Sequence, residues 1–270
     1  MRTLLQLAFV VFLSTTVLAQ WANVPAPQIP RTADGKPNLS APAPRLPDGT
    51  PDLSGVWSPP TGYSRDLARD LKEGVPFQPW AKTLYDERAS GSLWKEEPDA
   101  NCLPQGVPKV LLVPAVWRIV QTPKIVFFVH EAFNLWWQAF TDGRRFVPHE
   151  DVAPTWHGYS TAKWDGDTLV VDVTNINDDP TRPTWLDASG NYHSDALHVE
   201  ERYTFNGPNM ITYRARLEDP KVYRQPFTIE VTLYRHMEKN FRLMDYECQV
   251  FKDKLVREGK GDHLRIVENN

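Results

Sequence analysis

The sequence lacks the short motifs that mark several common enzyme chemistries. It has no Gly-x-Ser-x-Gly elbow, no phosphate-binding glycine loop, no dinucleotide-binding fingerprint and no Cys-x-x-Cys pair. Serine hydrolysis, phosphoryl transfer and hydride transfer are therefore disfavoured, and we expect no organic cofactor.

An excess of one charge is also lacking. The 30 Lys and Arg residues nearly balance the 34 Asp and Glu residues, and the basic residues are scattered along the chain. Nucleic acids and anionic membrane surfaces attract massed positive charge, so we expect no nucleic-acid partner. The sequence leaves the oligomeric state open.

Long apolar runs are lacking after the N-terminus. There, Arg2 is followed by an apolar run over residues 4–18 and by Val17-Leu18-Ala19 before Gln20, which is the order of a secretory signal peptide. We predict a signal peptide over residues 1–19, no integral membrane segment after its cleavage, and a periplasmic or secreted location. An uncleaved N-terminal anchor is the alternative.

Cysteine is scarce, since only Cys102 and Cys248 are present. An even number of cysteines in an oxidising compartment predicts one disulfide between them. Two buried free thiols are the alternative.

Proline, by contrast, is concentrated near the start of the chain. Ten prolines lie between Pro25 and Pro60, and they predict an extended arm over residues 20–60. Within it, Asp-Gly-Lys-Pro-Asn-Leu-Ser at 34–40 is echoed by Asp-Gly-Thr-Pro-Asp-Leu-Ser at 48–54. Two copies are typical of a repeated turn that holds the arm in place.

The rest of the chain is predicted to form a single β-barrel domain over residues 61–254, with two short helices near 64–93 and a C-terminal tail over 255–270. The predicted strands are rich in β-branched and aromatic residues. They span residues 116–122, 125–132, 135–141, 168–176, 197–205, 210–217, 227–236 and 241–250.

Short connections between these strands favour an antiparallel up-and-down order. Asp165-Gly166 has the residues that a two-residue hairpin turn requires. We expect no parallel crossovers, because no helix fits between successive strands. About eight such strands after a Gly-x-Trp strand are enough to close a barrel, which removes the exposed sheet edges.

Two resemblances follow from these residues. Leu53-Ser54-Gly55-Val56-Trp57 before a meander of strands resembles the start of the lipocalin-like, or calycin, barrels. That resemblance implies a mainly β, lipocalin-like barrel. Other segments resemble a large group of uncharacterised secreted proteins of soil bacteria over roughly residues 34–250, which implies secretion but no reaction. These segments are 52–57, 142–144, 156–160, 164–171 and 193–202.

Strand parity singles out one carboxylate. In the strand predicted over 197–205, Val199, Glu201 and Tyr203 share an otherwise apolar face. A carboxylate there is either paired or has a raised pKa, as a general acid near neutral pH requires. Glu201 is therefore a catalytic candidate. A structural salt bridge to Arg144, Arg214 or Arg216 is the alternative.

Three further side chains are acid/base candidates. Glu131 ends an apolar strand face and would form an acid/base pair with Glu201 if the two converge in one cavity. Two solvent-exposed rim carboxylates are the alternative. His193 lies in an irregular segment, where binding residues concentrate, and His198 lies on the same strand as Glu201.

A metal site is the weaker interpretation of the histidines. His149, His193 and His198, with Glu201, have side chains that zinc, copper or iron bind. No His-x-His or His-x-x-x-His pair occurs. We therefore expect no metal, with a divalent ion as the alternative.

Ten tryptophans make the chain rich in aromatic area. Trp136 and Trp137 are adjacent on a strand, so they point to opposite sides of the sheet. Aromatic rings at a cavity mouth suit sugars, aromatic molecules and terpenoids. Packing within a large β-core is the alternative. The predicted ligand-binding residues are Arg144, Trp137, Trp156, Tyr159 and Tyr203.

Three functions are compatible with these features. The first is a secreted barrel that binds a small apolar, aromatic or glycosidic molecule. The second is a cofactor-independent acid/base enzyme, a lyase, isomerase or hydrolase, acting in the barrel cavity. The third is an envelope interaction module.

Overall fold

A computed structural model describes residues 31–36, 38, 40–145, 153–177, 185–238 and 240–258. The predicted signal peptide, residues 20–30 of the predicted arm and residues 259–270 of the predicted tail lie outside the described residues, as does His149.

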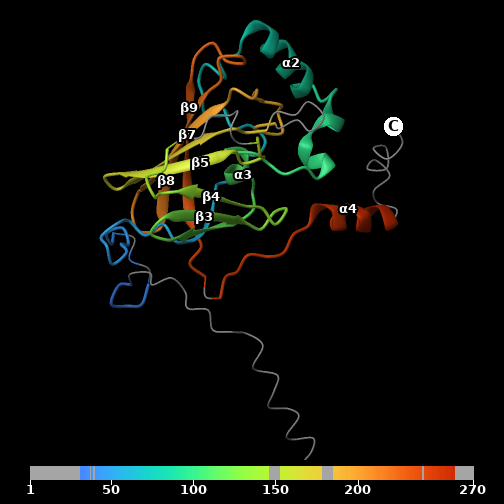
Figure 1. Cartoon of the computed structure of the whole chain (residues 1–270). Helices are drawn as coiled ribbons and strands as arrows, with labels where there is room; N and C mark the ends of the chain where they lie inside the picture. Colours follow the sequence, from blue (N-terminus) through green and yellow to red (C-terminus); the bar gives the residue numbers. More distant parts are fainter. Residues whose placement is uncertain are drawn as a thin grey trace, which may run out of the picture.

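Nine strands form one closed barrel (Figure 1). Each strand pairs with its neighbours in the chain, and β1 pairs with β9 through Trp57 with Arg235 and Ser58 with Tyr234. The predicted mainly β barrel is therefore confirmed. The strands are β1 (Gly55–Ser58), β2 (Trp117–Gln121), β3 (Ile125–His130), β4 (Trp136–Phe140), β5 (Tyr159–Asp165), β6 (Thr168–Thr174), β7 (His198–Phe205), β8 (Met210–Glu218) and β9 (Phe227–Arg235).

Side chains along the long strands alternate between the barrel interior and the outside. In β8, for example, buried Ile211 and Tyr213 alternate with more exposed neighbours, as a side-chain period of two requires. The predicted hairpin between β5 and β6 is also present. Asp165 pairs with Thr168 across it, and Gly166 has a φ of 57°, a conformation that glycine adopts without steric cost.

The exclusion of parallel pairing is wrong at one position. β4 and β5 are parallel, with Ala139 opposite Ser160 and Phe140 opposite Thr161. A parallel pair needs a crossover long enough to return the chain to the same end of the sheet. Residues 141–158, between the end of β4 and the start of β5, are long enough for that crossover.

Within the described ranges, fewer residues lie in helices than in strands. Of the two predicted near 64–93, the second forms as α2, whereas residues 61–73 form turns. Pro79 suits the start of α2 because its missing N–H group has no partner there in any case. No helix in the described ranges has the length and hydropathy that crossing a bilayer demands. The helices are α2 (Pro79–Ala89), η2 (Trp94–Glu96), η3 (Pro98–Asn101), α3 (Lys109–Leu112) and α4 (Cys248–Arg257).

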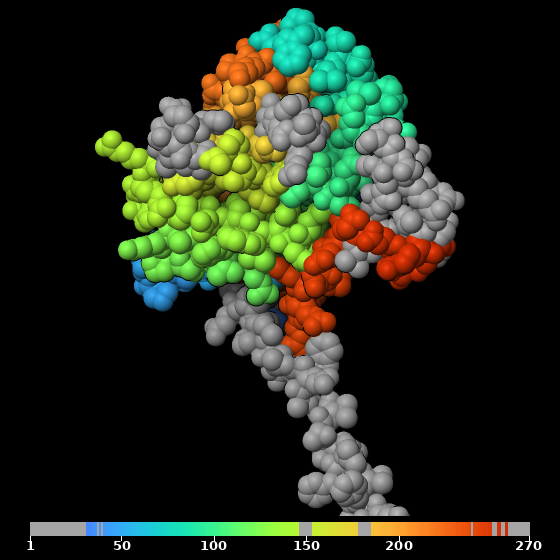
Figure 2. All heavy atoms as spheres, turned by 45° about the vertical axis from the view of Figure 1, so that its right-hand side comes forward, coloured from blue at the N-terminus to red at the C-terminus, as the bar shows by residue number. Residues whose placement is uncertain are grey.

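The strand predicted over 241–250 is wrong. β9 already pairs with β1, so the barrel is closed without a further strand. The chain instead runs along the outside of the β3–β4 hairpin (Figure 2). There Tyr246 forms an isolated bridge with Ala132 and its ring lies 6.1 Å from that of Phe133. Helix α4 follows.

The predicted disulfide is confirmed. Cys102 and Cys248 are bonded with an S–S distance of 2.09 Å and are 146 residues apart in sequence. Cys102 follows η3, and Cys248 begins α4. The bond therefore joins the segment before the first long strands to the C-terminal helix.

Aromatic side chains fill the barrel interior. Trp57, Trp117, Phe128, Tyr203 and Tyr213 are all fully buried. The Phe128 ring lies 6.2 Å from that of Trp117 and 5.7 Å from that of Tyr203, which in turn lies 5.1 Å from Tyr213. These rings form one continuous core, with centroid separations at which aromatic pairs attract.

The short helix α3 adds to this core. All four of its residues are buried, including Lys109. Its Val110 lies near His130, the last residue of β3, so α3 covers that end of the barrel. Because the helix contributes side chains where an open barrel would have its mouth, the interior is closed on that side.

Trp57 closes the opposite end of the barrel. Its indole N–H donates to the Leu53 carbonyl oxygen at 2.9 Å, and the Arg235 guanidinium lies 4.7 Å from the centre of its ring. Arg235 also donates to the Asp52 carbonyl oxygen at 3.1 Å. The Gly-x-Trp strand therefore places an indole that closes one end of the barrel.

The two copies of the repeated motif form similar turns. Gly35 N–H donates to the Thr32 carbonyl oxygen, and Gly49 N–H donates to that of Leu46, each at 2.9 Å. An arginine four residues before each glycine donates to the glycine carbonyl oxygen. The second turn, residues 45–51, is bonded to the barrel through Arg45, which donates to Asp167, and through Pro51, which accepts from Gln121.

Candidate functional site

Glu201 lies inside the barrel on β7 and is fully buried. The Tyr213 hydroxyl donates to its Oε1 at 2.6 Å. Burial raises the pKa of Glu201 to about 7, although Tyr213 and Tyr203 act in the opposite direction. The carboxyl therefore sits in the protonation range of a general acid.

The three arginines proposed as salt-bridge partners of Glu201 each pair with another carboxylate. Arg214 pairs with Glu230 at 2.5 Å, Arg216 with Glu218 at 2.7 Å, and Arg144 with Asp142 at 2.7 Å. Each of these pairs lies on the outer surface. The charge of Glu201 is accommodated by its raised pKa and its tyrosine neighbours.

Glu131 has a different environment. Its Oε1 accepts from the backbone N–H of Val116 at 3.3 Å, and its Oε2 accepts from that of Met244 at 3.1 Å. The carboxylate thus joins the start of β2 to the C-terminal segment. Glu201 instead accepts from Tyr213 inside the barrel, so the two carboxylates have separate surroundings and do not form a pair.

The two candidate histidines contact groups other than Glu201. His198 lies on the outer face of β7, where its Nε2 is 2.9 Å from Oδ1 of Asp172, and this contact raises the pKa of His198. His193 is buried, its Nδ1 lies 2.8 Å from the Ser194 carbonyl oxygen, and burial lowers its pKa. Within the described part of the chain, no three His, Cys, Asp or Glu side chains are placed to hold a metal ion.

The adjacent tryptophans point to opposite sides, as predicted. Trp136 is 63% exposed, whereas Trp137 is 5% exposed. Inside the barrel, Trp137 stacks between Phe128 and His157, with ring centroids at 5.0 Å and 4.9 Å. Trp137 and Tyr203 are therefore core residues.

The other predicted ligand-binding residues lie outside the barrel. The Arg144 guanidinium lies 3.6 Å from the centre of the Phe140 ring, and the Tyr159 ring lies 5.7 Å from the same ring. Trp156 is half-buried in the segment before β5. The five predicted residues are thus divided between the interior and the outer surface.

The interior around Glu201 has no room for a ligand. Glu201, Tyr203 and Tyr213 each have 0% of their surface exposed, so no space that admits water adjoins them. An acid or base must lie within hydrogen-bond reach of its substrate. In this conformation Glu201 contacts only the protein and is out of reach of a substrate.

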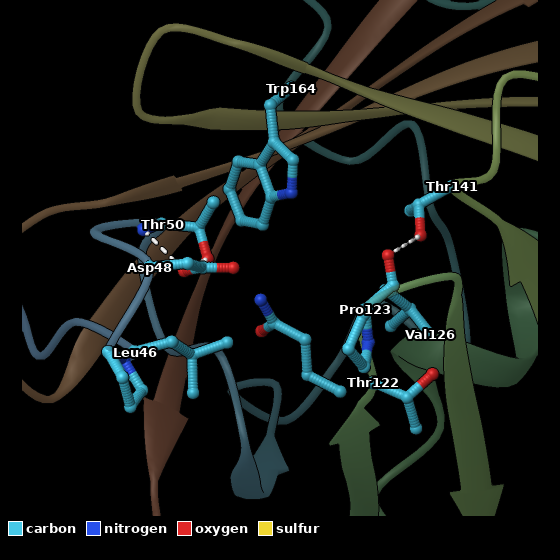
Figure 3. A pocket seen from close by; sticks show the side chains of 10 residues that line it. Leu46, Asp48, Thr50, Thr122, Pro123, Val126, Thr141 and Trp164 are labelled. Atoms are coloured by element: carbon cyan, nitrogen blue, oxygen red, sulfur yellow. Dashed lines mark hydrogen bonds between the residues drawn. The ribbon is translucent and has the colours of Figure 1, made fainter.

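An open cleft lies instead at the barrel end that holds Trp57. Its volume is about 380 Å³. It is bounded by the second turn of the arm, by the β2–β3 hairpin, and by Trp164 at the end of β5 (Figure 3). Figure 3 shows Asp48 and Thr50 on one side of this space and Thr122 and Pro123 on the other. The lining residues are Leu46, Pro47, Asp48, Thr50, Gln121, Thr122, Pro123, Val126, Thr141 and Trp164.

The cleft combines apolar and polar groups. Trp164 packs partly against the core, and Val126 is buried beneath the cleft. Asp48 and Thr50 lie on the arm, and Gln121 ends β2. A few polar groups around an apolar surface are typical of small-molecule sites.

Gln121 and Arg45 are two of the side chains that hold the arm against the barrel. The Gln121 side chain accepts from Leu53 N–H and donates to the Pro51 carbonyl oxygen, each at 3.1 Å. Arg45 forms a two-pronged ion pair with Asp167 in the β5–β6 turn. The position of Asp48 and Thr50 therefore depends on both contacts.

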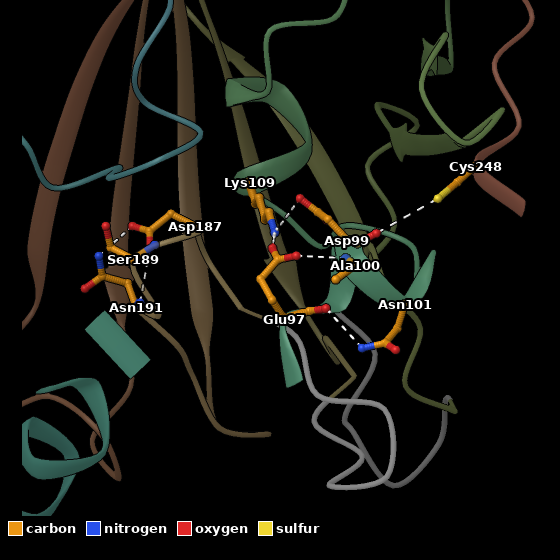
Figure 4. Close-up of polar contacts among 9 residues, drawn as sticks. All are labelled: Glu97, Asp99, Ala100, Asn101, Lys109, Asp187, Ser189, Asn191 and Cys248. Atoms are coloured by element: carbon orange, nitrogen blue, oxygen red, sulfur yellow. Dashed lines mark hydrogen bonds and ion pairs between the residues drawn. The ribbon is translucent and has the colours of Figure 1, made fainter. Parts of the chain in front are cut away.

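A buried charge cluster lies elsewhere, beside the disulfide (Figure 4). The Lys109 ammonium lies 3.1 Å from Oε1 of Glu97 and 3.0 Å from Oδ2 of Asp99. Glu97 also accepts from Ala100 N–H, which caps η3. These contacts fix α3 and η3 against each other, and they explain how a lysine is buried there without an unpaired charge.

Comparison with known proteins adds no functional assignment, because no family model, no curated protein and no solved structure matches the chain.

Sequence reasoning missed most of the cleft. No local pattern in the sequence singles out Trp164, Asp48 or Gln121 as cleft residues. One usable signal was the second Asp-Gly-x-Pro turn, which is followed directly by the strand that plugs the barrel. That proximity predicts that the turn lies at the plugged end, but not which side chains face it.

Proposed function

We propose that this protein is an exported, lipocalin-like barrel that binds a small apolar, aromatic or glycosidic molecule in the cleft between the arm and the barrel end. The observation that carries the proposal is the contrast in accessibility. The cleft of about 380 Å³ places the Trp164 indole and several polar groups beside open space, whereas the polar residues of the interior are enclosed.

Export is supported by two independent features. The first 19 residues have the order of a signal peptide. The disulfide between Cys102 and Cys248 is a bond that persists in oxidising compartments. We therefore propose a periplasmic or secreted location for the mature protein.

An acid/base enzyme is the second candidate, and one observation favours it. The pKa of Glu201 is raised to about 7 by burial, which is the range that general acids use. Such an enzyme must open its core to admit a substrate. Loss of turnover in Glu201→Gln, with folding intact, would support this candidate.

The binding proposal is tested with purified mature protein and four probes. These are indole, p-nitrophenol, methyl β-D-glucopyranoside and cellobiose, followed by saturation-transfer NMR. We expect saturable binding of at least one probe. Trp164→Ala should weaken that binding at least about tenfold, because tryptophan is the largest apolar side chain among the lining residues.

Trp136→Ala is the matched control. Trp136 is 63% exposed on the outer face of β4 and does not line the cleft, so its removal should leave binding unchanged. The proposal fails if no probe binds, or if both tryptophan variants reduce binding equally.

A further inference from the structure

The charges around the cleft restrict its ligand. None of its ten described lining residues is Lys, Arg or His, and one, Asp48, is acidic. Hydrogen bonds from Thr50 lower the pKa of Asp48, so this carboxylate is ionised at neutral pH. The nearby Arg45 is already paired with Asp167. An anionic ligand would therefore meet a negative charge with no free cation among the lining residues to offset it.

The hydrogen-bonding capacity of the cleft is mixed. Both bonds from Thr50 fall on Oδ1 of Asp48, at 2.9 Å and 2.6 Å, so they leave Oδ2 to accept from a ligand. The Gln121 amide uses one N–H and one lone pair on the arm backbone. An amide has two N–H groups and two lone pairs, so Gln121 retains one donor and one acceptor.

The apolar part of the cleft consists of the Trp164 indole together with Leu46, Pro47, Pro123 and Val126. Trp164 is half-buried, with one part against the core and another lining the cleft. Thr122 and Thr141 lie on the hairpin side of the space (Figure 3). The cleft thus offers an aromatic face together with hydroxyl, amide and carboxylate groups.

We propose that the natural ligand of the cleft is a neutral saccharide. A pyranose ring has one face of C–H groups, which can lie on the Trp164 indole, and hydroxyl groups that both donate and accept hydrogen bonds. Asp48 accepts hydrogen bonds from these hydroxyls, and Gln121 both donates to them and accepts from them. The inference rests on the proposed binding function and names its ligand class.

The volume of the cleft limits how much of the saccharide can be bound in it. About 380 Å³ is near the lower end of the ~300–1,000 Å³ range of small-molecule sites. The cleft accordingly holds one or two sugar rings. A wholly apolar molecule of the same size would leave Asp48 and Gln121 desolvated without partners, which costs affinity.

The test compares four probes on the full mature protein by saturation-transfer NMR and isothermal titration calorimetry. Methyl β-D-glucopyranoside and cellobiose are neutral, methyl β-D-glucuronide carries a carboxylate, and indole has no hydroxyl group. We expect the neutral sugars to bind at least about tenfold more tightly than the glucuronide, because two like charges face each other in that complex.

Asp48→Asn supplies the second comparison. It should weaken binding of methyl β-D-glucopyranoside about threefold to tenfold and reduce the discrimination against the glucuronide. Asp34→Asn is its matched control, because Asp34 has the same position in the first copy of the repeated turn and does not line the cleft. It should leave both affinities unchanged.

Four outcomes would contradict the inference or the role that it assigns to Asp48. If indole binds in a Trp164-dependent manner and neither neutral sugar binds, the ligand class is wrong while the proposed binding function stands. If no probe binds, both are wrong. If the glucuronide binds as tightly as the neutral sugars, or if Asp48→Asn behaves like Asp34→Asn, the assigned role of Asp48 is wrong.

Discussion

The barrel interior and the arm cleft each contain a carboxylate that accepts a hydrogen bond from a hydroxyl at 2.6 Å. In the interior the pair is Glu201 with Tyr213, and in the cleft it is Asp48 with Thr50. The two carboxyl groups nevertheless shift in opposite directions, since the pKa of Glu201 is raised to about 7 and that of Asp48 is lowered. Solvent access, and not the local hydrogen bond, decides the charge.

This difference suggests that the barrel interior determines stability and that the cleft determines ligand binding. The buried Glu201 carboxyl makes the free energy of unfolding depend on pH. The exposed Asp48 carboxylate can accept hydrogen bonds from a ligand. We therefore expect changes in the interior to alter unfolding without altering binding, and changes around the cleft to do the reverse. Four sets of variants test this separation.

Removal of the disulfide should have the largest effect. In the double variant Cys102→Ser, Cys248→Ser, the unfolded chain is no longer closed across 146 residues. The chain-entropy relation gives a loss of about 5 kcal/mol in the free energy of unfolding. Urea denaturation measures the loss. Affinity for methyl β-D-glucopyranoside should stay within about twofold, and a large fall in affinity would contradict the separation.

Glu201→Gln should change the pH dependence of stability. The folded pKa of about 7 exceeds the reference value of 4.5, so the contribution of the protonated carboxyl is complete below 4.5 and is lost as the pH rises through 7. The difference in unfolding free energy, variant minus wild type, should therefore rise by about 3 kcal/mol between about pH 4 and pH 9. A flat difference in denaturation titrations across that range would show that Glu201 does not titrate in the folded state.

His157→Phe should act in the opposite pH range. Burial lowers the pKa of His157 to about 4 from 6.5, so its contribution is complete above 6.5 and is lost as the pH falls through 4. Phenylalanine keeps the stack on Trp137 and does not titrate. The variant should be more stable than wild type at acid pH, by up to about 3 kcal/mol, with the gain vanishing above about pH 7. A gain independent of pH in the same titration would indicate a packing effect only.

Arg45→Ala should have the smallest effect on folding and a measurable one on binding. The Arg45–Asp167 pair is largely solvent-exposed, and such pairs add little to stability. Its loss should leave the urea midpoint unchanged and weaken methyl β-D-glucopyranoside binding about threefold, because the turn that carries Asp48 is less well positioned.

Arg31→Ala is the matched control, since Arg31 makes the same backbone contact in the first turn. Its affinity should equal that of wild type. High salt should reproduce the effect of Arg45→Ala in wild-type protein, because salt screens exposed charges. Equal effects of the two arginine variants would contradict the assigned role of the second turn.

Much of the fold follows from local patterns. Alternating side chains predicted most of the strands, the parity of β7 placed Glu201 inside, and the cysteine count predicted the disulfide. The parallel pairing of β4 with β5 could not be predicted, because the pairing of strands joined by a long crossover depends on contacts distant in sequence. The C-terminal strand was wrong because closure by β1 and β9 left no edge for it.

The candidate site was harder to predict. Parity showed that Glu201 faces inward but not that rings and helix α3 fill the space around it, since packing density depends on every side chain present. The cleft is assembled from the arm, the β2–β3 hairpin and the end of β5. Those three segments are far apart in sequence, and no local pattern connects Asp48 with Trp164.

The short first strand has a further consequence. β1 meets β9 through only two residue pairs, and it is continuous with the segment whose backbone is bonded to Gln121. A ligand that holds this segment against the barrel end must also stabilise the pairing of β1 with β9, by thermodynamic linkage. A ligand bound in the cleft should therefore slow amide hydrogen exchange at Trp57 and Ser58. Exchange at these two residues would then serve as a measure of ligand binding.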